Sequence, residues 1–234
     1  MRKNILIIML CIAIIGCDKK DDDDDLLDKI DSYPIVVGNE WTYRIESITK
    51  EYDSESFDKI INIDTFTVIT YVSVTKDTIL NDLIEVRQIK TTISNTVNYR
   101  YVNLDSEGLK EYGYFNQGFN NIYIYEIPKL EVKLPLYKNS NWINYYPQGL
   151  IGTQIEKEVV SSEVVKIENK DYLCFKIQKY NDSFSGVEMF EWISKDGLIK
   201  SQEIYGENEL QFGDGSKKYI QITNTTILSD LKLN

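Results

Sequence analysis

Histidine is absent from the 234 residues of this chain. Without an imidazole, the protein cannot build a Ser-His-Asp or Cys-His catalytic arrangement, and it lacks the commonest metal ligand among the side chains. It also lacks the usual general base near neutral pH. We therefore predict no catalytic residue, no metal site and no cofactor.

Cysteine is scarce, and its three positions have different fates. Cys11 lies inside an N-terminal leader, and Cys17 lies at the end of that leader. Cys174 is then the remaining thiol of the mature chain, so an intrachain disulfide is excluded even in an oxidising compartment. Its position between Leu173 and Phe175, with no evident base or cationic partner, favours a packed, unreactive thiol.

Basic residues are in the minority, with 26 Lys and Arg against 37 Asp and Glu and a formal net charge of −11. This balance argues against nucleic acid as a partner and against docking on anionic lipid head groups. Proline is rare, with four residues, and there is very little alanine, whereas tyrosine occurs 17 times beside abundant Ile, Val and Thr. Such a composition is typical of a strand-rich protein.

A hydrophobic run long enough to span a membrane is also missing. The longest run covers 11 residues, Ile5–Ile15, against the roughly 20 that a transmembrane helix needs. The run follows a positively charged start, which is typical of a secretory signal peptide over residues 1–16. Its end, Ile14-Ile15-Gly16-Cys17, resembles the bacterial lipobox, so Cys17 is the predicted lipidation site and membrane anchor. The alternative is an ordinary signal peptide that happens to contain a cysteine.

Residues 17–33 combine the lipidated cysteine with an acidic spacer. Asp18 to Asp31 contains eight Asp and three Lys, and like charges at this density repel one another and favour disorder. The run after Cys17 resembles the short acidic signal that directs Bacteroidetes lipoproteins to the cell exterior. We therefore predict an outer-membrane lipoprotein exposed at the cell surface, with a periplasm-facing anchor as the alternative.

Alternating apolar and polar residues recur along the rest of the chain, between turns rich in Gly, Asn and Asp. Six strands are predicted between residues 41 and 127, and five more between 153 and 228, with residues 128–142 as a break. The prediction is an all-β protein with little helix. We expect an antiparallel meander of about 10–12 strands, curled into a half-barrel or barrel-like sheet.

One short pattern occurs twice. Pro34 precedes Trp41 by seven residues, and Pro135 precedes Trp142 by the same spacing. Proline favours an extended approach, Gly38 or an Asn supplies a turn, and the tryptophan begins a strand as a buried plug. We interpret residues 34–234 as a single β domain of two half-sheet repeats starting near 34 and 135. The alternative is that the two tryptophans form a shared aromatic platform.

The first copy, with Tyr43 completing it, also carries a family resemblance. The pattern Pro-x-x-x-Gly-x-x-Trp-x-Tyr over residues 34–43, with "DSEGLKEYGY" and "EWISKDGLIKSQ" later, resembles uncharacterised Bacteroidetes lipoproteins. The strand pattern is similar to the curved half-barrels of lipoprotein and lipid carriers. This resemblance implies architecture and a cell-envelope location; its motifs mark turns and strand starts and imply no known chemistry.

Aromatic density is the compositional feature most compatible with a ligand. Pairs spaced by two residues share a strand face and are the candidate ligand-facing aromatics: Tyr112, Tyr114, Tyr123, Tyr125, Phe190 and Trp192. They would hold an apolar or sugar-like ligand by area and stacking. The alternative is that they are cross-strand packing pairs.

The predicted function is a non-catalytic binding or scaffold module for an apolar ligand or a partner polypeptide of the envelope. The alternative is a surface lipoprotein that binds or processes carbohydrate. A glycosidase would need two carboxyls at a fixed separation. Glu188 with Glu191, or Glu111 with Glu126, are the conceivable pairs, but nothing in their spacing selects one.

Overall fold

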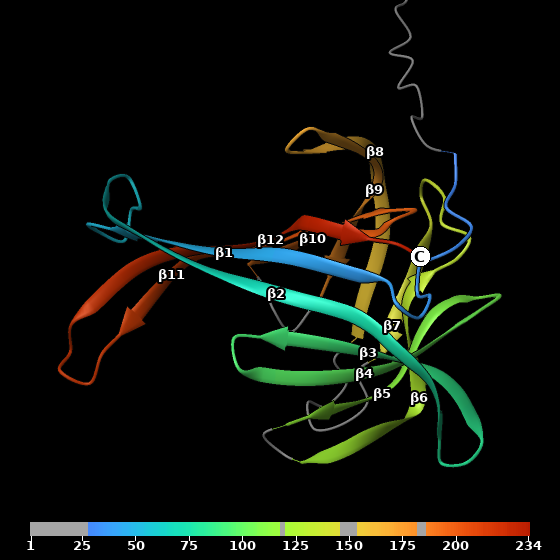
Figure 1. Cartoon of the computed structure of the whole chain (residues 1–234). Helices are drawn as coiled ribbons and strands as arrows, with labels where there is room; N and C mark the ends of the chain where they lie inside the picture. Colours follow the sequence, from blue (N-terminus) through green and yellow to red (C-terminus); the bar gives the residue numbers. More distant parts are fainter. Residues whose placement is uncertain (1–27, 118–119, 146–153, 182–185) are drawn as a thin grey trace, which may run out of the picture.

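The structure is a computed structural model, and it describes residues 28–117, 120–145, 154–181 and 186–234 (Figure 1). The predicted leader, the lipidation site Cys17 and most of the acidic spacer lie outside the described residues. Within them there are strands and turns and no helix. The twelve strands are β1 (Glu40–Tyr52), β2 (Ile60–Leu80), β3 (Ile84–Ile93), β4 (Thr96–Asp105), β5 (Gly108–Asn116), β6 (Asn121–Lys133), β7 (Asn141–Tyr145), β8 (Gln154–Ile167), β9 (Lys170–Tyr180), β10 (Val187–Ser194), β11 (Gly197–Gln211) and β12 (Lys217–Lys232).

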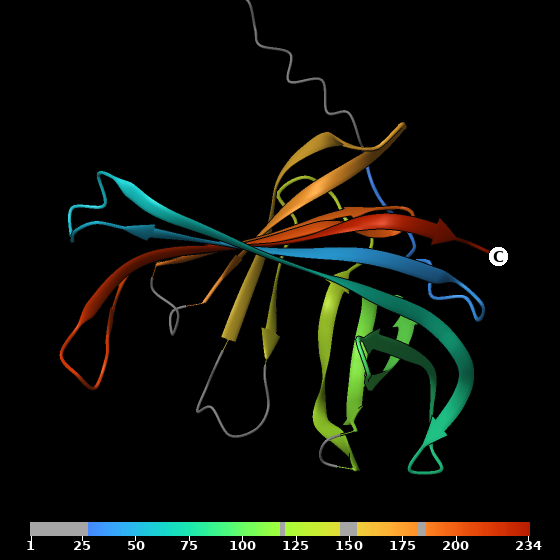
Figure 2. The same cartoon turned by 60° about the vertical axis from the view of Figure 1, so that its left-hand side comes forward.

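All twelve strands belong to one antiparallel sheet. Their order is β6-β5-β4-β3-β2-β1-β12-β11-β10-β9-β8-β7, so nearly every strand pairs with its neighbour in the chain. Figures 1 and 2 show the sheet curling until its two edge strands, β6 and β7, approach each other. The result is a nearly closed, barrel-shaped sheet, which confirms the predicted fold class.

The repeated proline motif builds two turns of the same kind. Gly38 and Asn139, each four residues after the proline, have positive φ angles of 94° and 63°. Gly38 N and Asn39 O bond Val74 in β2, and Asn139 N and Ser140 O bond Val159 in β8 in the same pattern. A bulge follows both valines. Both motifs therefore start a strand pair with the same register and kink.

The two motifs occupy different places in the sheet. β1 lies at its centre and pairs with β12, whereas β7 lies at an edge. The peptide bond before Pro135 is cis, and no cis bond precedes Pro34. Each motif nevertheless begins a run of six strands, and the two runs join through the β1–β12 ladder.

The β6–β7 seam closes through side chains. Trp142 Nε1 in β7 donates to the Leu130 carbonyl in β6 at 3.1 Å, and Lys157 Nζ in β8 donates to the Glu131 carbonyl at 2.9 Å. Pro128 in β6 has no N–H to offer a neighbouring strand, as suits an edge strand. Barrel closure therefore depends on a few long polar and aromatic side chains.

Strand boundaries depart from the sequence prediction in two places. β2 continues to Leu80 through residues 76–80, although the sequence "KDTILND" at 76–82 favours a connector between strands. Residues 128–133 extend β6 instead of forming the predicted break. In both segments the partner strand supplies backbone hydrogen bonds. Tertiary pairing overrides local turn signals here.

The packed part of the chain includes a residue of the predicted spacer over 17–33. Ile30, assigned to the spacer by sequence, is 3% exposed and forms a two-hydrogen-bond bridge with Leu136. Tyr33 and Pro34 pack beside Gly197, and Ile35 is buried. The charged composition of the spacer predicts disorder, but these apolar residues pack against the barrel.

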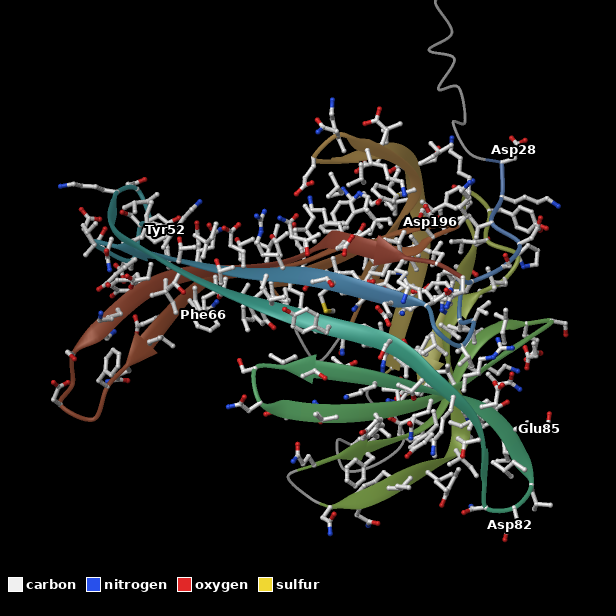
Figure 3. The ribbon with its side chains drawn as sticks, viewed as in Figure 1. Asp28, Tyr52, Phe66, Asp82, Glu85 and Asp196 are labelled. Carbon is white, nitrogen blue, oxygen red and sulfur yellow. The ribbon has the colours of Figure 1, made fainter. Side chains whose placement is uncertain are left out.

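An arm projects from the barrel. It is formed by the ends of β1, β2, β11 and β12 that extend beyond the other strands (Figure 1). Figure 3 shows Tyr52 and Phe66 on this arm, far from Asp82 and Glu85 at the β2–β3 hairpin. Phe57 contacts the rings of Tyr52 and Tyr219 at 5.0 and 5.8 Å. Most of β2 before Val68 is solvent-exposed, so the main core lies in the barrel and not in the arm.

Candidate functional site

The concave face of the sheet forms a half-open cavity of about 470 Å³. Most strands contribute to its wall, and so do Tyr33 and Ile35 of the N-terminal segment. The lining is mainly apolar, with members such as Trp41, Ile45, Val72, Ile89, Val102 and Ile193. The volume lies within the range of about 300–1,000 Å³ that is typical of small-molecule sites.

Strand alternation explains which residues reach this cavity. In β4, Asn98, Arg100 and Val102 share a face and line it, whereas Tyr99 and Tyr101 point away. Arg100 is unusual because it places a guanidinium among apolar neighbours. The cavity therefore combines an apolar wall with a small number of charges.

The first cluster of charged side chains at the cavity centres on Glu191. Its carboxylate lies 3.3 Å from Lys157 Nζ and 3.1 Å from Lys179 Nζ. Burial alone would raise the pKa of Glu191, but the two ammonium groups outweigh it and lower the pKa to about 2. Lys157, 3% exposed, also lies 3.5 Å from the Glu131 carboxylate, which accepts a hydrogen bond from Asn144. These two glutamates and two lysines form one ionic network in which the opposite charges balance.

The second cluster of charged side chains centres on Glu111, which is 5% exposed. It accepts a hydrogen bond from Tyr125 Oη at 2.9 Å and lies 3.9 Å from Lys129 and 3.7 Å from Arg100. Burial raises the pKa of Glu111, and Arg100 and Lys129 offset only part of this effect. Burial likewise lowers the pKa of Lys129.

Two tyrosines at the cavity wall have weakened acidity. Burial raises the pKa of Tyr33 to about 12 and raises that of Tyr43 well above its ordinary value. Tyr43 Oη donates to the Leu198 carbonyl at 3.0 Å, which holds its ring against the cavity. Both hydroxyls therefore remain neutral donors at physiological pH.

Three of the predicted ligand-facing aromatics come together. Tyr114 stacks on Tyr123 with centroids 5.6 Å apart, and it also contacts Tyr125 at 5.9 Å. Tyr125 carries Lys129 above its ring at 4.1 Å. These three tyrosines lie on the Glu111 side of the sheet, but they do not line the main cavity.

The other three predicted aromatics lie elsewhere. A bulge at Tyr112 breaks the alternation, so Tyr112 packs in an outer cluster with Tyr99 and Phe115, while Tyr114 faces the opposite side. Phe190 and Trp192 are 6.0 Å apart. Both alternate with cavity-facing residues on β10 and so point away from the cavity.

Trp192 is instead part of the packing beneath the β8–β9 hairpin. It is 3% exposed, its indole N–H donates to the Glu163 carboxylate, and Lys200 lies 4.3 Å from its ring. Lys176 lies 4.4 Å from the Phe190 ring. Cys174 is fully buried, and burial raises the pKa of its thiol to about 12, which favours an inert thiol.

The tryptophans of the repeated motif are both buried, at 5% for Trp41 and 6% for Trp142. Trp41 Nε1 donates to the Asp196 carbonyl at 2.9 Å. Trp41 also lines the cavity, as does its neighbour Tyr43, so these residues shape the candidate site as well as the fold.

The two carboxylate pairs weighed for hydrolysis do not converge. Glu126 and Glu188 are exposed, whereas Glu111 and Glu191 are directed into the protein interior. Glu191 faces the cavity, and Glu111 lies behind Arg100. The carboxylates near the cavity are thus Glu131 and Glu191, with Lys157 between them.

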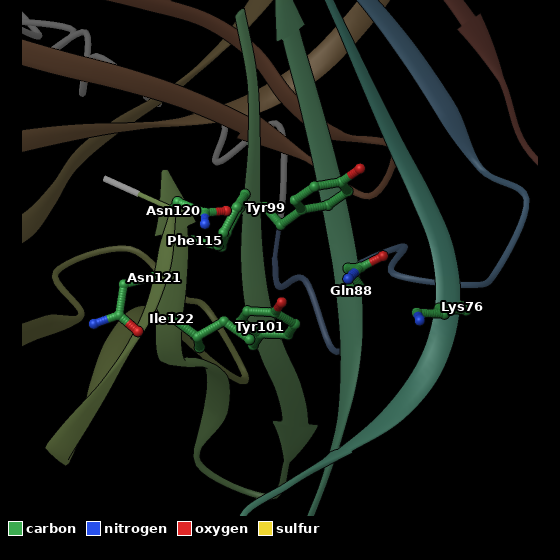
Figure 4. Close-up of a pocket in the computed structure, with 8 residues that line it drawn as sticks. All are labelled: Lys76, Gln88, Tyr99, Tyr101, Phe115, Asn120, Asn121 and Ile122. Atoms are coloured by element: carbon green, nitrogen blue, oxygen red, sulfur yellow. The ribbon is translucent and has the colours of Figure 1, made fainter. Parts of the chain in front are cut away.

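A second, open groove lies on the outer face of β2–β6. Figure 4 shows Tyr99, Tyr101, Phe115 and Ile122 beside the polar side chains that line the groove, namely Lys76, Gln88, Asn120 and Asn121. Its volume is about 570 Å³. Aromatic faces beside amides are the side-chain types that suit sugars.

Sequence reasoning missed Arg100, Glu131 and Lys157 as site residues. A signal was present for Lys157, because it shares its strand phase with Ile155 and Val159, both buried. A cation in phase with buried aliphatic residues faces the interior. Arg100 has no such clear signal, since its neighbours of opposite phase are tyrosines that are themselves largely buried.

Comparisons with known proteins give one structural similarity. No family model matches the sequence, and no curated protein matches it. A crystal structure of a candidate lipoprotein from Parabacteroides distasonis is similar with 12% identity and a TM-score of 0.31, covering 88% of this chain and 100% of that one.

Two kinds of feature are absent from the described residues. No helix there has the length and apolarity to cross a membrane. Nor do those residues contain a cluster of three or more His, Cys, Asp or Glu side chains suited to a metal ion.

Proposed function

We propose that this protein is a lipid-anchored lipoprotein of the bacterial outer membrane that holds an apolar ligand inside its barrel-shaped sheet. The lipobox-like sequence ending at Cys17 supports the anchor, and the acidic run after it supports exposure at the cell surface. The N-terminal segment leads from this tether directly to the wall of the cavity through Tyr33. Anchor and binding domain are therefore closely linked along the chain.

The observation that carries the proposal is the half-open, mainly apolar cavity on the concave face of the sheet. Ligand sites are typically clefts of about 300–1,000 Å³ with a mainly apolar lining and a few polar groups. The cavity, at about 470 Å³ with a mainly apolar lining, has these properties, which supports a role in holding a ligand. Burial of apolar ligand surface supplies roughly 25 cal/mol per Å².

We propose binding without catalysis. Glycoside hydrolysis requires one carboxyl that is protonated near neutral pH and a second one at a fixed separation. The Glu191 carboxylate is held ionised by Lys157 and Lys179. Glu111, whose pKa is raised, is engaged by Tyr125 and is separated from the cavity by Arg100. Neither carboxyl is free to serve a substrate.

The test uses an uncharged fluorophore, N-phenyl-1-naphthylamine, titrated into the lipidated chain in nanodiscs, with empty nanodiscs subtracted. Thr91 lines the cavity, so Thr91→Phe should fill it and weaken binding at least tenfold. Thr65 is exposed on the arm, so Thr65→Phe is the matched control and should bind as the parent does. Equal binding by parent and Thr91→Phe, with circular dichroism unchanged, would contradict an interior site.

The outer groove supports a second candidate, binding of a surface glycan. Tyr99 lines the groove together with Gln88 and Asn121, whose amides could hydrogen-bond sugar hydroxyls. Tyr99→Ala should abolish retention on a glycan array, whereas Tyr71→Ala, an exposed tyrosine outside the groove, should not. Unchanged glycan retention by Tyr99→Ala would remove this candidate.

A further inference from the structure

Arg100 has an unusual environment for an arginine within a protein. Its guanidinium carries five N–H donors. Among the described residues it has one charged contact, from Nη1 to Glu111 Oε2 at 3.7 Å, which is too long for a hydrogen bond. The side chain is 46% exposed, and since Arg100 lines the cavity, the exposed part faces this space. Its donors are therefore available to a molecule in the cavity.

Each carboxylate around the cavity has partners other than Arg100, and none of these carboxylates in the described residues accepts a hydrogen bond from Arg100. Glu191 is bound by two lysines, and Glu131 accepts from Asn144 and lies beside Lys157. Glu111 has Tyr125 and Lys129 in addition to Arg100. Four cations thus face three carboxylates, and Arg100 is the cation of this set with no hydrogen bond among the described residues.

Two further polar groups on the same wall have no hydrogen-bond partner in the part of the chain that the structure describes. Thr70 Oγ1 and Asn98 Oδ1 are buried and make no hydrogen bond within the described structure, and both residues line the cavity. Asn98 lies two residues from Arg100 on β4, so their side chains share a face. Buried polar atoms are rarely left unpaired in native proteins. The Thr70 hydroxyl can donate a hydrogen bond to a bound carboxylate, whereas Asn98 Oδ1 only accepts and needs a donor such as water.

We propose that the cavity binds an aliphatic carboxylate, with its charged head on Arg100 and its hydrocarbon tail against the apolar wall. This inference rests on the proposed ligand-binding function and specifies the chemistry of the ligand. A carboxylate matches the planar fork of a guanidinium with two parallel hydrogen bonds. Ile89 and Val102 are next to Arg100 in the sheet and supply the apolar surface that a tail would cover.

The experiment compares octanoate with 1-octanol, which have the same chain length and differ in charge. Both are titrated calorimetrically into the lipidated chain in nanodiscs, with empty nanodiscs subtracted. The parent protein should bind octanoate at least tenfold more tightly than octanol. Arg100→Gln should lose this preference while retaining octanol binding, and Arg100→Lys should keep a reduced preference because it retains charge without the planar fork.

Arg44→Gln provides the matched control. Arg44 is exposed on β1 and lies between Tyr43 and Ile45, which line the cavity, so it points away from the ligand. This variant should keep the full preference for octanoate. Equal affinities for both probes in the parent, or an undiminished preference in Arg100→Gln, would overturn the role of Arg100 and leave the apolar site standing. Failure of both probes to bind would contradict the proposed function itself, and this inference with it.

Discussion

Glu191 shows how a charged residue is accommodated inside this barrel. Burial favours the neutral acid, yet Lys157 and Lys179 keep the carboxylate ionised and lower its pKa to about 2, below the ordinary value of 4.5. The charged form therefore contributes stability above pH 4.5, and this contribution is lost as the pH falls from 4.5 toward 2. The ionic network should consequently be sensitive to acid.

Glu191→Gln isolates this contribution. The pH-dependent part of the stability difference from the parent should be about 3 kcal/mol at pH 7 and should shrink toward zero near pH 2. Denaturant unfolding at several pH values measures it. Glu188→Gln, at an exposed position of the same strand, should give a curve parallel to that of the parent. Parallel curves for Glu191→Gln as well would disprove the assigned pKa shift.

Trp41 and Trp142 test whether the repeated motif is a packing device. Each indole is at least 94% buried and donates a hydrogen bond to a distant backbone carbonyl. Replacement by Ala should cost about 3–5 kcal/mol of unfolding free energy in each case. Tyr71→Ala, at an exposed site, should cost less than about 1 kcal/mol. Denaturant midpoints close to the parent for both tryptophan variants would favour an exposed platform instead.

At the scale of elements, tight hairpins position the walls of the cavity. The β4–β5 turn places Gly108 at φ 140°, and a Cβ there would collide with the Val132 carbonyl of β6. This glycine allows β5 and β6 to approach beside the N-terminal bridge at Leu136. A side chain at Gly108 would separate these elements.

Gly108→Ala should lower the unfolding free energy by at least about 2 kcal/mol, since both backbone conformation and space oppose a side chain. Gly213, in the β11–β12 turn, has open space around it, so Gly213→Ala should change stability by less than about 1 kcal/mol. Thermal or denaturant melts of the two variants make the comparison. Equal stabilities would show that the turn adapts freely.

At the scale of the whole molecule, a barrel that starts at residue 30 is joined to a predicted lipid anchor at Cys17 by a short acidic tether. Cys17→Ala should release the protein from the membrane fraction, because the thiol is the predicted attachment point. Circular dichroism and the unfolding midpoint should stay unchanged. Incorporation of labelled fatty acid into the alanine variant would refute Cys17 as the site.

The amino-acid sequence by itself determined the all-β class, the hairpin order and both proline–tryptophan turns. Alternation, Gly and Asn at turns, and Gly38 and Asn139 at positive φ are local properties, so they can be read from neighbouring residues. Only the tertiary structure decided which faces enclose the cavity. The bulge at Tyr112 reverses the expected face, and Arg100 meets Glu111 through pairing between β4 and β5. Such contacts depend on bulges and on strand register, which a local pattern of apolar and polar residues does not specify.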